Sequence, residues 1–172
     1  MGEPPSPTAA LVTVVAADEQ AATDGVAVDL DRWAALAEAA VIESGARGEL
    51  TLTFVDRAEI AALNAEHLGK DGPTDVLSFP LDDDETPQPG VPVLLGDVVV
   101  CPAVAADQAS AHAGTVDDEV ALLVVHGVLH VLGHDHADPA EEARMREREL
   151  TLLQLHHWHG DVPTGFRQEH ES

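Results

Sequence analysis

The segment from Val116 to Leu132 is the feature that most constrains the fold of this chain. Thr115 and Asp118 form the cap of a helix start, and Gly133 ends the helix because glycine adopts the left-handed conformation at little cost. Between these ends the residues are strongly apolar, so the helix has little polar surface to present to water. We expect such a helix to be buried against a sheet.

The remainder of the chain predicts alternating strands and helices. Strands are expected where apolar residues alternate or form short runs, and helices where they recur every three or four positions. The expected strands are 10–17, 49–55, 75–80 and 94–100, and the expected helices are 31–44, 56–69, a short helix from Pro102, 116–132 and 138–155. The order β-α-β-α-β-β-α-α-α is typical of a single α+β domain.

Composition limits the surroundings and partners of this domain. We expect residues 1–8 to be disordered, residues 9–158 to form the domain and residues 159–172 to be a polar tail. Lys plus Arg number 8 against 32 Asp plus Glu, so the formal net charge is −24, which argues against a general nucleic-acid-binding surface but leaves room for a small basic site. With one cysteine, no run of transmembrane length and no signal peptide, we expect a soluble cytoplasmic protein.

Three histidines near the end of the apolar helix have the spacing of metal ligands. His126 and His130 are four residues apart and share one helix face, about one turn of 5.4 Å along the axis. Gly133 turns the chain back, so that His136 can supply a third nitrogen. Three imidazoles plus an open position are typical of a catalytic zinc site. We therefore predict one Zn²⁺ per chain held by His126, His130 and His136, with His134 as a loop residue.

The same spacing matches the metzincin protease pattern His-Glu-x-x-His-x-x-Gly-x-x-His, with one difference. The glutamate of that pattern is the general base of peptide hydrolysis, and Gly127 stands in its place here. A protease is therefore disfavoured. A divalent ion can still polarise a bound oxygen, and the anionic oxygens of a phosphodiester suit such a site.

Three segments resemble the YbeY family, bacterial single-domain endoribonucleases of ribosomal RNA maturation. They are HGVLHVLGHDH at 126–136, Leu63-Asn64 followed by GKDGPTDVLSFP at 69–80, and LGDVVV at 95–100. The resemblance covers about residues 50–150 and implies a mixed four-stranded sheet with helices around it. It also implies a zinc-dependent, single-strand-specific endoribonuclease of 16S rRNA 3′-end maturation and ribosome quality control, with ribosomal RNA and the small ribosomal subunit as partners.

One position departs from the family pattern. Many members carry an arginine thought to contact RNA where this chain has Leu68. We therefore predict that Lys70 binds substrate, with Arg57 as the other nearby basic candidate. The alternative for Lys70 is a solvated residue at a helix end that pairs with Asp71.

The residues leave two further alternatives open. Asp75 and Asp97 are each able either to orient a ligand histidine or to cap a turn. The histidine pattern also fits a ribosome-assembly factor with a structural metal, or a metallohydrolase of another substrate. An open coordination position favours an enzyme, whereas a fourth protein ligand favours the structural role. No catalytic group beyond the metal centre is predicted.

Overall fold

Four strands form one sheet in the part of the chain that the computed structural model describes, which is residues 12–21, 25–81, 93–134 and 138–168. Their bounds are β1 Val12–Asp18, β2 Gly48–Phe54, β3 Val76–Pro80 and β4 Leu94–Val100. The strand order is β1-β2-β4-β3, with β1, β2 and β4 mutually parallel and β3 antiparallel to β4. The expected α+β class with a mixed four-stranded sheet is confirmed.

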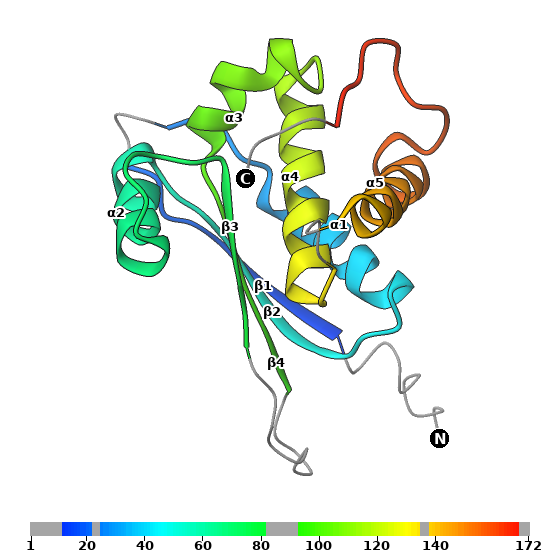
Figure 1. The fold of residues 1–172 in the computed structure, drawn as a ribbon, viewed down its shortest axis with the longest axis horizontal. Helices are drawn as coiled ribbons and strands as arrows, with labels where there is room; N and C mark the ends of the chain where they lie inside the picture. The colour runs from blue at the N-terminus through cyan, green and yellow to red at the C-terminus, as the bar shows by residue number, and fades with distance from the viewer. Residues whose placement is uncertain (1–11, 22–24, 82–92, 135–137, 169–172) are drawn as a thin grey trace.

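Five α-helices surround this sheet in the described ranges (Figure 1). They are α1 Leu30–Glu43, α2 Arg57–Leu68, α3 Pro102–Gln108, α4 Val116–Val131 and α5 Pro139–Leu153. The expected bounds differ from these by one or two residues. A 3-10 turn at Ala109–Ala111 and a π-helical turn at Gln154–Trp158 were not predicted. None of the described helices is long and apolar enough to cross a membrane.

Some expectations fall on residues that the structure does not describe. The expected disordered terminus at 1–8 and the last residues of the predicted tail, 169–172, lie outside the described ranges. The described part of the tail returns to the domain. Phe166 packs edge-on against Trp158 with ring centroids 4.7 Å apart, and the backbone N–H of Arg167 donates to the carbonyl of His112 at 3.0 Å.

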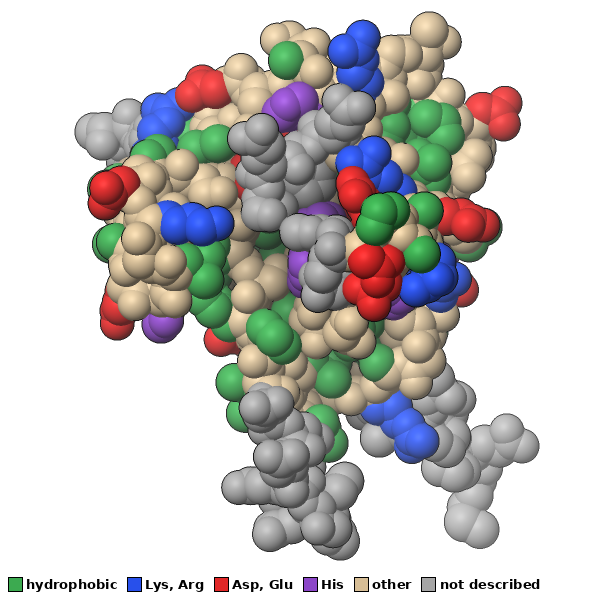
Figure 2. Space-filling view, viewed as in Figure 1, with side chains coloured by type: hydrophobic (Ala, Val, Ile, Leu, Met, Phe, Trp, Pro, Cys, Tyr) green, Lys and Arg blue, Asp and Glu red, His purple; other side chains and the backbone are tan. Residues whose placement is uncertain are grey.

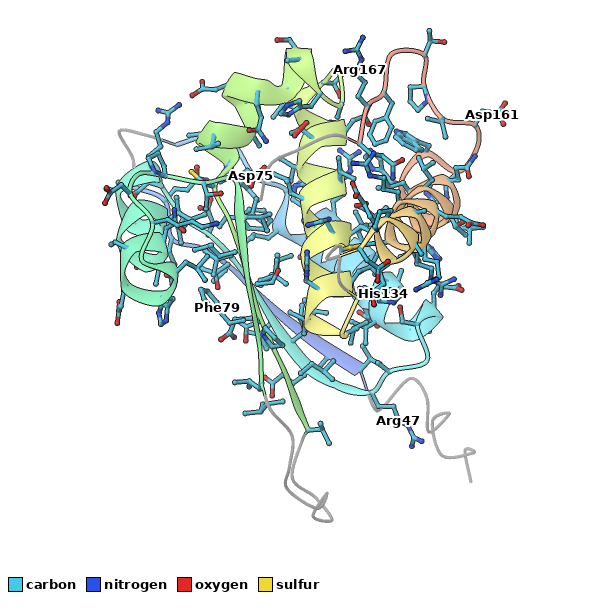
Figure 3. All side chains as sticks on the ribbon, viewed as in Figure 1. Arg47, Asp75, Phe79, His134, Asp161 and Arg167 are labelled. Atoms are coloured by element: carbon cyan, nitrogen blue, oxygen red, sulfur yellow. The ribbon has the colours of Figure 1, made fainter. Side chains whose placement is uncertain are left out.

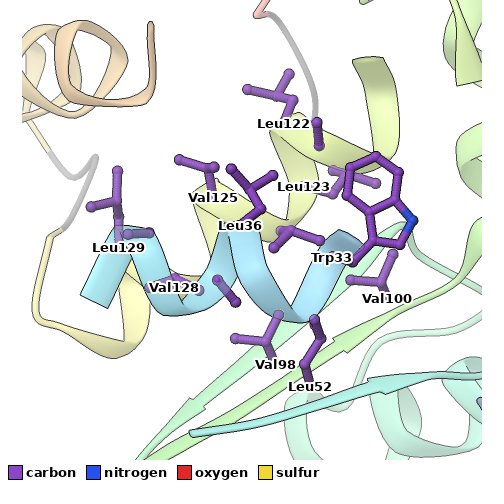
Figure 4. Packing of buried hydrophobic residues seen from close by; sticks show 14 of the residues in the cluster. Trp33, Leu36, Leu52, Val98, Val100, Leu122, Leu123, Val125, Val128 and Leu129 are labelled. Atoms are coloured by element: carbon purple, nitrogen blue, oxygen red, sulfur yellow. The ribbon is translucent and has the colours of Figure 1, made fainter. Parts of the chain in front are cut away.

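The main core lies between the sheet and helices α1, α4 and α5. Side chains from one face of the sheet meet the buried faces of these helices, and α4 runs through the middle of the layer (Figure 4). The core residues labelled in Figure 4 are Trp33, Leu36, Leu52, Val98, Val100, Leu122, Leu123, Val125, Val128 and Leu129. The burial expected for the apolar helix is confirmed.

A second, smaller core lies on the other face of the sheet, under α2. Ile60 of α2 packs there with Leu77 of β3 and Val99 of β4. Because successive side chains of a strand point to opposite faces, Val98 belongs to the main core and Val99 to the second one. The sheet therefore separates α2 from α4 (Figure 1).

Candidate metal centre

The last two turns of α4 bring His126 and His130 together. Their ring centroids are 4.6 Å apart and their ring planes are inclined by 74°. His126 is buried, with 5% of its surface exposed, whereas His130 is partly exposed. The spacing of four residues places both rings on one helix face, as the sequence predicts. The pair offers two imidazoles to one ion at the boundary between the core and solvent.

The chain leaves α4 through a Schellman turn. Gly133 has a φ of 99°, its N–H donates to the carbonyl of His130 at 3.0 Å, and the N–H of His134 donates to the carbonyl of Leu129 at 2.9 Å. These two bonds satisfy carbonyls at the helix end and reverse the chain direction. His134, partly exposed, follows beside the lower end of α4 (Figure 3).

The third predicted ligand, His136, lies outside the described residues. It belongs to the connection 135–137 between His134 and Asp138. Asp138 caps α5, since its carboxylate accepts from the N–H groups of Ala140 and Glu141, each at 2.9 Å. Within the described ranges no three metal-binding side chains come close enough to hold an ion. The assignment of His136 therefore stays a prediction.

Behind His126 lies a carboxylate that the sequence analysis missed. The Nδ1 atom of His126 is 3.3 Å from Oε2 of Glu149 on α5, and the two side chains are 6% and 2% exposed. Glu149 occupies a position in the buried face of α5 that otherwise carries Met145, Leu152 and Leu153. A glutamate inside an apolar helix face was the sequence signal for this residue.

Asp75 and Asp97, the two aspartates that the sequence offered for orienting a ligand histidine, have other surroundings. Asp75 is buried, and its carboxylate accepts from the N–H of Val76 at 2.8 Å and from Nε2 of Gln108 at 2.9 Å. Asp97 lines a cavity of about 440 Å³. Because Val98 faces α4, the preceding side chain of Asp97 points to the opposite face of the sheet. That orientation separates Asp97 from the two histidines of α4.

Position 127, which a protease would fill with glutamate, has no space for a side chain. A Cβ atom on Gly127 would lie 2.5 Å from Cγ1 of Val98 and 3.3 Å from Oγ of Ser78. The hydroxyl of Ser78 also donates to the carbonyl of Gly127 at 3.2 Å. A glutamate here would have to displace the Val98 side chain, so the packing of α4 on β4 leaves no room for the general base of the metzincin pattern.

The candidate substrate residue Lys70 is exposed just beyond the end of α2. Gly69 ends this helix with a φ of 64°, and the backbone N–H of Lys70 donates to the carbonyl of Asn64 at 3.3 Å. Leu68, in the position of the family arginine, is 52% exposed. No ion pair joins Lys70 to Asp71 within the described ranges. The lysine head group is therefore available to an anionic ligand.

Arg57, the other basic candidate, is held by α3. Its guanidinium donates to Oδ2 of Asp107 at 2.6 Å and to the carbonyl of Ala103 at 3.3 Å. These contacts engage the Arg57 guanidinium at the protein surface, whereas Lys70 has no ion pair among the described residues, which favours Lys70 as the phosphate contact. On the face shown in Figure 2, histidine side chains reach the surface near the middle, with charged groups of both signs to their right.

The amino-acid sequence of this chain is similar to those of a known protein family. The model of the family described as endoribonuclease YbeY matches residues 17–157. A protein named endoribonuclease YbeY from Salinispora tropica is 45% identical over 145 residues, which cover 78% of this chain and 92% of the relative. One of the same name from Kineococcus radiotolerans is 42% identical over 151 residues, covering 82% and 86%.

A solved structure shares the fold. A Thermotoga maritima protein, known from its solution structure, aligns with a TM-score of 0.56 over 90% of this chain and 100% of its own. The two sequences are 22% identical, so the likeness concerns the fold alone. The sheet and helices that position His126 and His130 thus belong to an architecture that recurs in a distant sequence.

Proposed function

Because this chain belongs to the endoribonuclease YbeY family, it is a hydrolase of RNA phosphodiester bonds, and we propose that it works through one zinc ion held by His126, His130 and His136. The observation that carries the proposal is the contact between the rings of His126 and His130 at the end of a buried helix. Two neighbouring imidazoles are donors that zinc prefers, and the sequence has a third candidate, His136, in the connection to α5.

The surroundings of the two histidines fit a metal ion. His126 is backed by a buried carboxylate, the arrangement that commonly supports a ligand imidazole, and His130 reaches the surface where a substrate can arrive. Zinc held there supplies Lewis acidity toward a phosphate oxygen or a water molecule. Lys70 supplies a positive charge for the RNA backbone in a chain of net charge −24.

We further propose the biological setting that the family resemblance implies. The substrate is single-stranded RNA at the 3′ end of 16S rRNA, the partner is the small ribosomal subunit, and the compartment is the cytoplasm. The match to the family model over residues 17–157 supports this setting, because it spans β2 to β4, α1 to α5, and both His126 and His130. Cleavage of precursor against mature 16S rRNA ends by the purified protein tests it.

The central experiment compares His130→Ala with wild type, and His134→Ala, just beyond the end of α4, is the matched control. Bound metal and cleavage of a single-stranded RNA are measured on each. We expect about one zinc per chain in wild type and His134→Ala, and loss of most zinc and cleavage in His130→Ala. Full zinc content in His130→Ala would overturn the metal site. Zinc binding without RNA cleavage in wild type would instead indicate an assembly factor with a structural metal.

A further inference from the structure

We propose that Glu149 is a positioning residue for the metal centre, which holds the His126 ring so that its Nε2 atom faces the ion. This inference rests on the proposed function, because it assumes that His126 is a ligand. It assigns a role to a residue of α5, a helix that supplies none of the three predicted ligands.

The contact between the two side chains is specific. Oε2 of Glu149 lies 3.3 Å from Nδ1 of His126. An ionised carboxylate can only accept a hydrogen bond, so with Glu149 ionised the Nδ1 atom is the donor of this contact and a neutral ring keeps its lone pair on Nε2. In this tautomer Nε2 is the ring atom whose lone pair can be donated to a metal.

The location of Glu149 is costly for a residue with a purely structural role. Its side chain is 2% exposed and shares the buried face of α5 with Met145, Leu152 and Leu153. Burial of a carboxylate carries a desolvation penalty that a leucine at this position would avoid. Other glutamates of α5 follow the usual pattern, since Glu147 is exposed and Glu142 pairs with Arg146 at the surface.

The ring of His126 is thus restrained from two sides. Glu149 holds the Nδ1 edge, and the ring of His130 packs against it at a centroid distance of 4.6 Å. A ring already turned toward the ion loses less freedom when the ion binds, and a hydrogen bond to a carboxylate makes the second nitrogen a stronger donor. Loss of such a partner typically weakens metal binding by about 10- to 100-fold.

The test uses Glu149→Gln and Glu149→Leu, with Glu147→Gln as a control that removes the same charge from the exposed face of α5. Zinc affinity is measured by competition with a chelator of known affinity. We expect about tenfold weaker binding in Glu149→Gln, about 100-fold weaker binding in Glu149→Leu, and wild-type affinity in Glu147→Gln. The intermediate value for glutamine reflects an amide oxygen that still accepts a hydrogen bond, but without charge.

A second measurement separates positioning from general destabilisation. Nitrogen chemical shifts of the His126 ring in the metal-free protein report which nitrogen carries the proton. We expect the proton on Nδ1 in wild type and Glu147→Gln, and a mixture of both tautomers in Glu149→Leu. If Glu149→Leu does not fold, Glu149→Gln alone decides the matter. Wild-type zinc affinity in Glu149→Gln would overturn this inference and leave the proposed function intact. A wild-type protein that binds no zinc would overturn both.

Discussion

Gly127 packs against Val98 so closely that a Cβ atom at position 127 would lie 2.5 Å from the Cγ1 atom of Val98. This contact sets the distance between α4 and β4. It also sets the rotation of α4, because the glycine must face the sheet. His126 and His130 take their directions from that rotation, so the packing of one glycine and the geometry of the candidate metal centre are linked.

Gly127→Ala should therefore destabilise the protein although alanine favours helices. Overpacking in a dense core typically costs about 1–3 kcal/mol, which exceeds the roughly 1 kcal/mol that alanine gains over glycine in a helix. The measurement is the free energy of unfolding in urea. Gly160→Ala is the matched control, because a Cβ atom there meets nothing within 4 Å. Equal unfolding free energies of Gly127→Ala and wild type would show that β4 accommodates the extra methyl group without loss of stability.

Asp118 should be a strong determinant of stability, unlike its neighbour Asp117. One oxygen of Asp118 accepts from Nε2 of His157 and from Nε1 of Trp158, each at 2.8 Å, which fastens the C-terminal turn to the start of α4. Asp118→Ala leaves two largely buried donors without their acceptor, at a cost of about 1–3 kcal/mol. Asp117→Ala removes an exposed ion pair with Arg32 and should cost less than about 1 kcal/mol.

Both variants remove one charge from the first turn of α4, so they lose the same interaction with the helix dipole. The difference between their unfolding free energies therefore compares the two hydrogen bonds of Asp118 to the C-terminal turn with the exposed ion pair of Asp117. Equal losses of stability would contradict a specific role for Asp118.

Local patterns predicted most elements of this fold. The bounds of α4 were predicted to within one residue, because they depend on signals close together in the sequence. These signals are the apolar run, the cap at Thr115 and the glycine at position 133. The proximity of His126 and His130 followed from helical spacing alone. The strand order β1-β2-β4-β3 could not be predicted in this way, because it depends on contacts between segments far apart in the chain.

The sequence analysis missed Glu149 for the same reason. Glu149 and His126 are separated by 23 residues and a turn, and their contact depends on how α5 folds back onto α4. The aspartates chosen from sequence were near the expected sheet, and Asp97 lies on its other face because side chains alternate along β4. An inventory of charged residues on apolar helix faces would have identified Glu149.

Zinc should stabilise the wild-type protein against heat, and chelation should reverse the effect. A ligand that binds the folded state alone adds about 2.7 kcal/mol at 100 times its dissociation constant. For a chain of this size each 1 kcal/mol corresponds to a shift in Tm of roughly 2–4 °C. Thermal unfolding of metal-free protein with and without zinc measures this shift. His130→Ala should show little of it, whereas an equal shift in His130→Ala would mean that zinc binds elsewhere.

Lys70→Ala should weaken RNA cleavage without changing metal content. Lys70 is exposed beyond α2, whereas Arg57 is engaged by Asp107, so Lys70 is the stronger candidate for a phosphate contact. Loss of one exposed charge contact corresponds to roughly 0.5–1 kcal/mol, or a roughly two- to fivefold rise in KM. The slope of log RNA affinity against log salt concentration should become shallower by the amount that corresponds to about one phosphate contact. Arg47→Ala, which removes an exposed charge far from α2 (Figure 3), is the matched control.

Leu68→Arg tests the same surface in the opposite direction. It places a guanidinium at the position where the family pattern has arginine, on a side chain that is already 52% exposed. RNA affinity should rise, and the gain should shrink as salt is added because screening weakens a charge contact at the surface. Metal content should stay at the wild-type value in both variants. If Lys70→Ala cleaves RNA with wild-type KM at every salt concentration while Leu68→Arg gains no affinity, RNA does not pass the end of α2. Its phosphates would then have to be bound by the metal ion, by backbone N–H groups, or by Arg57 after release from Asp107.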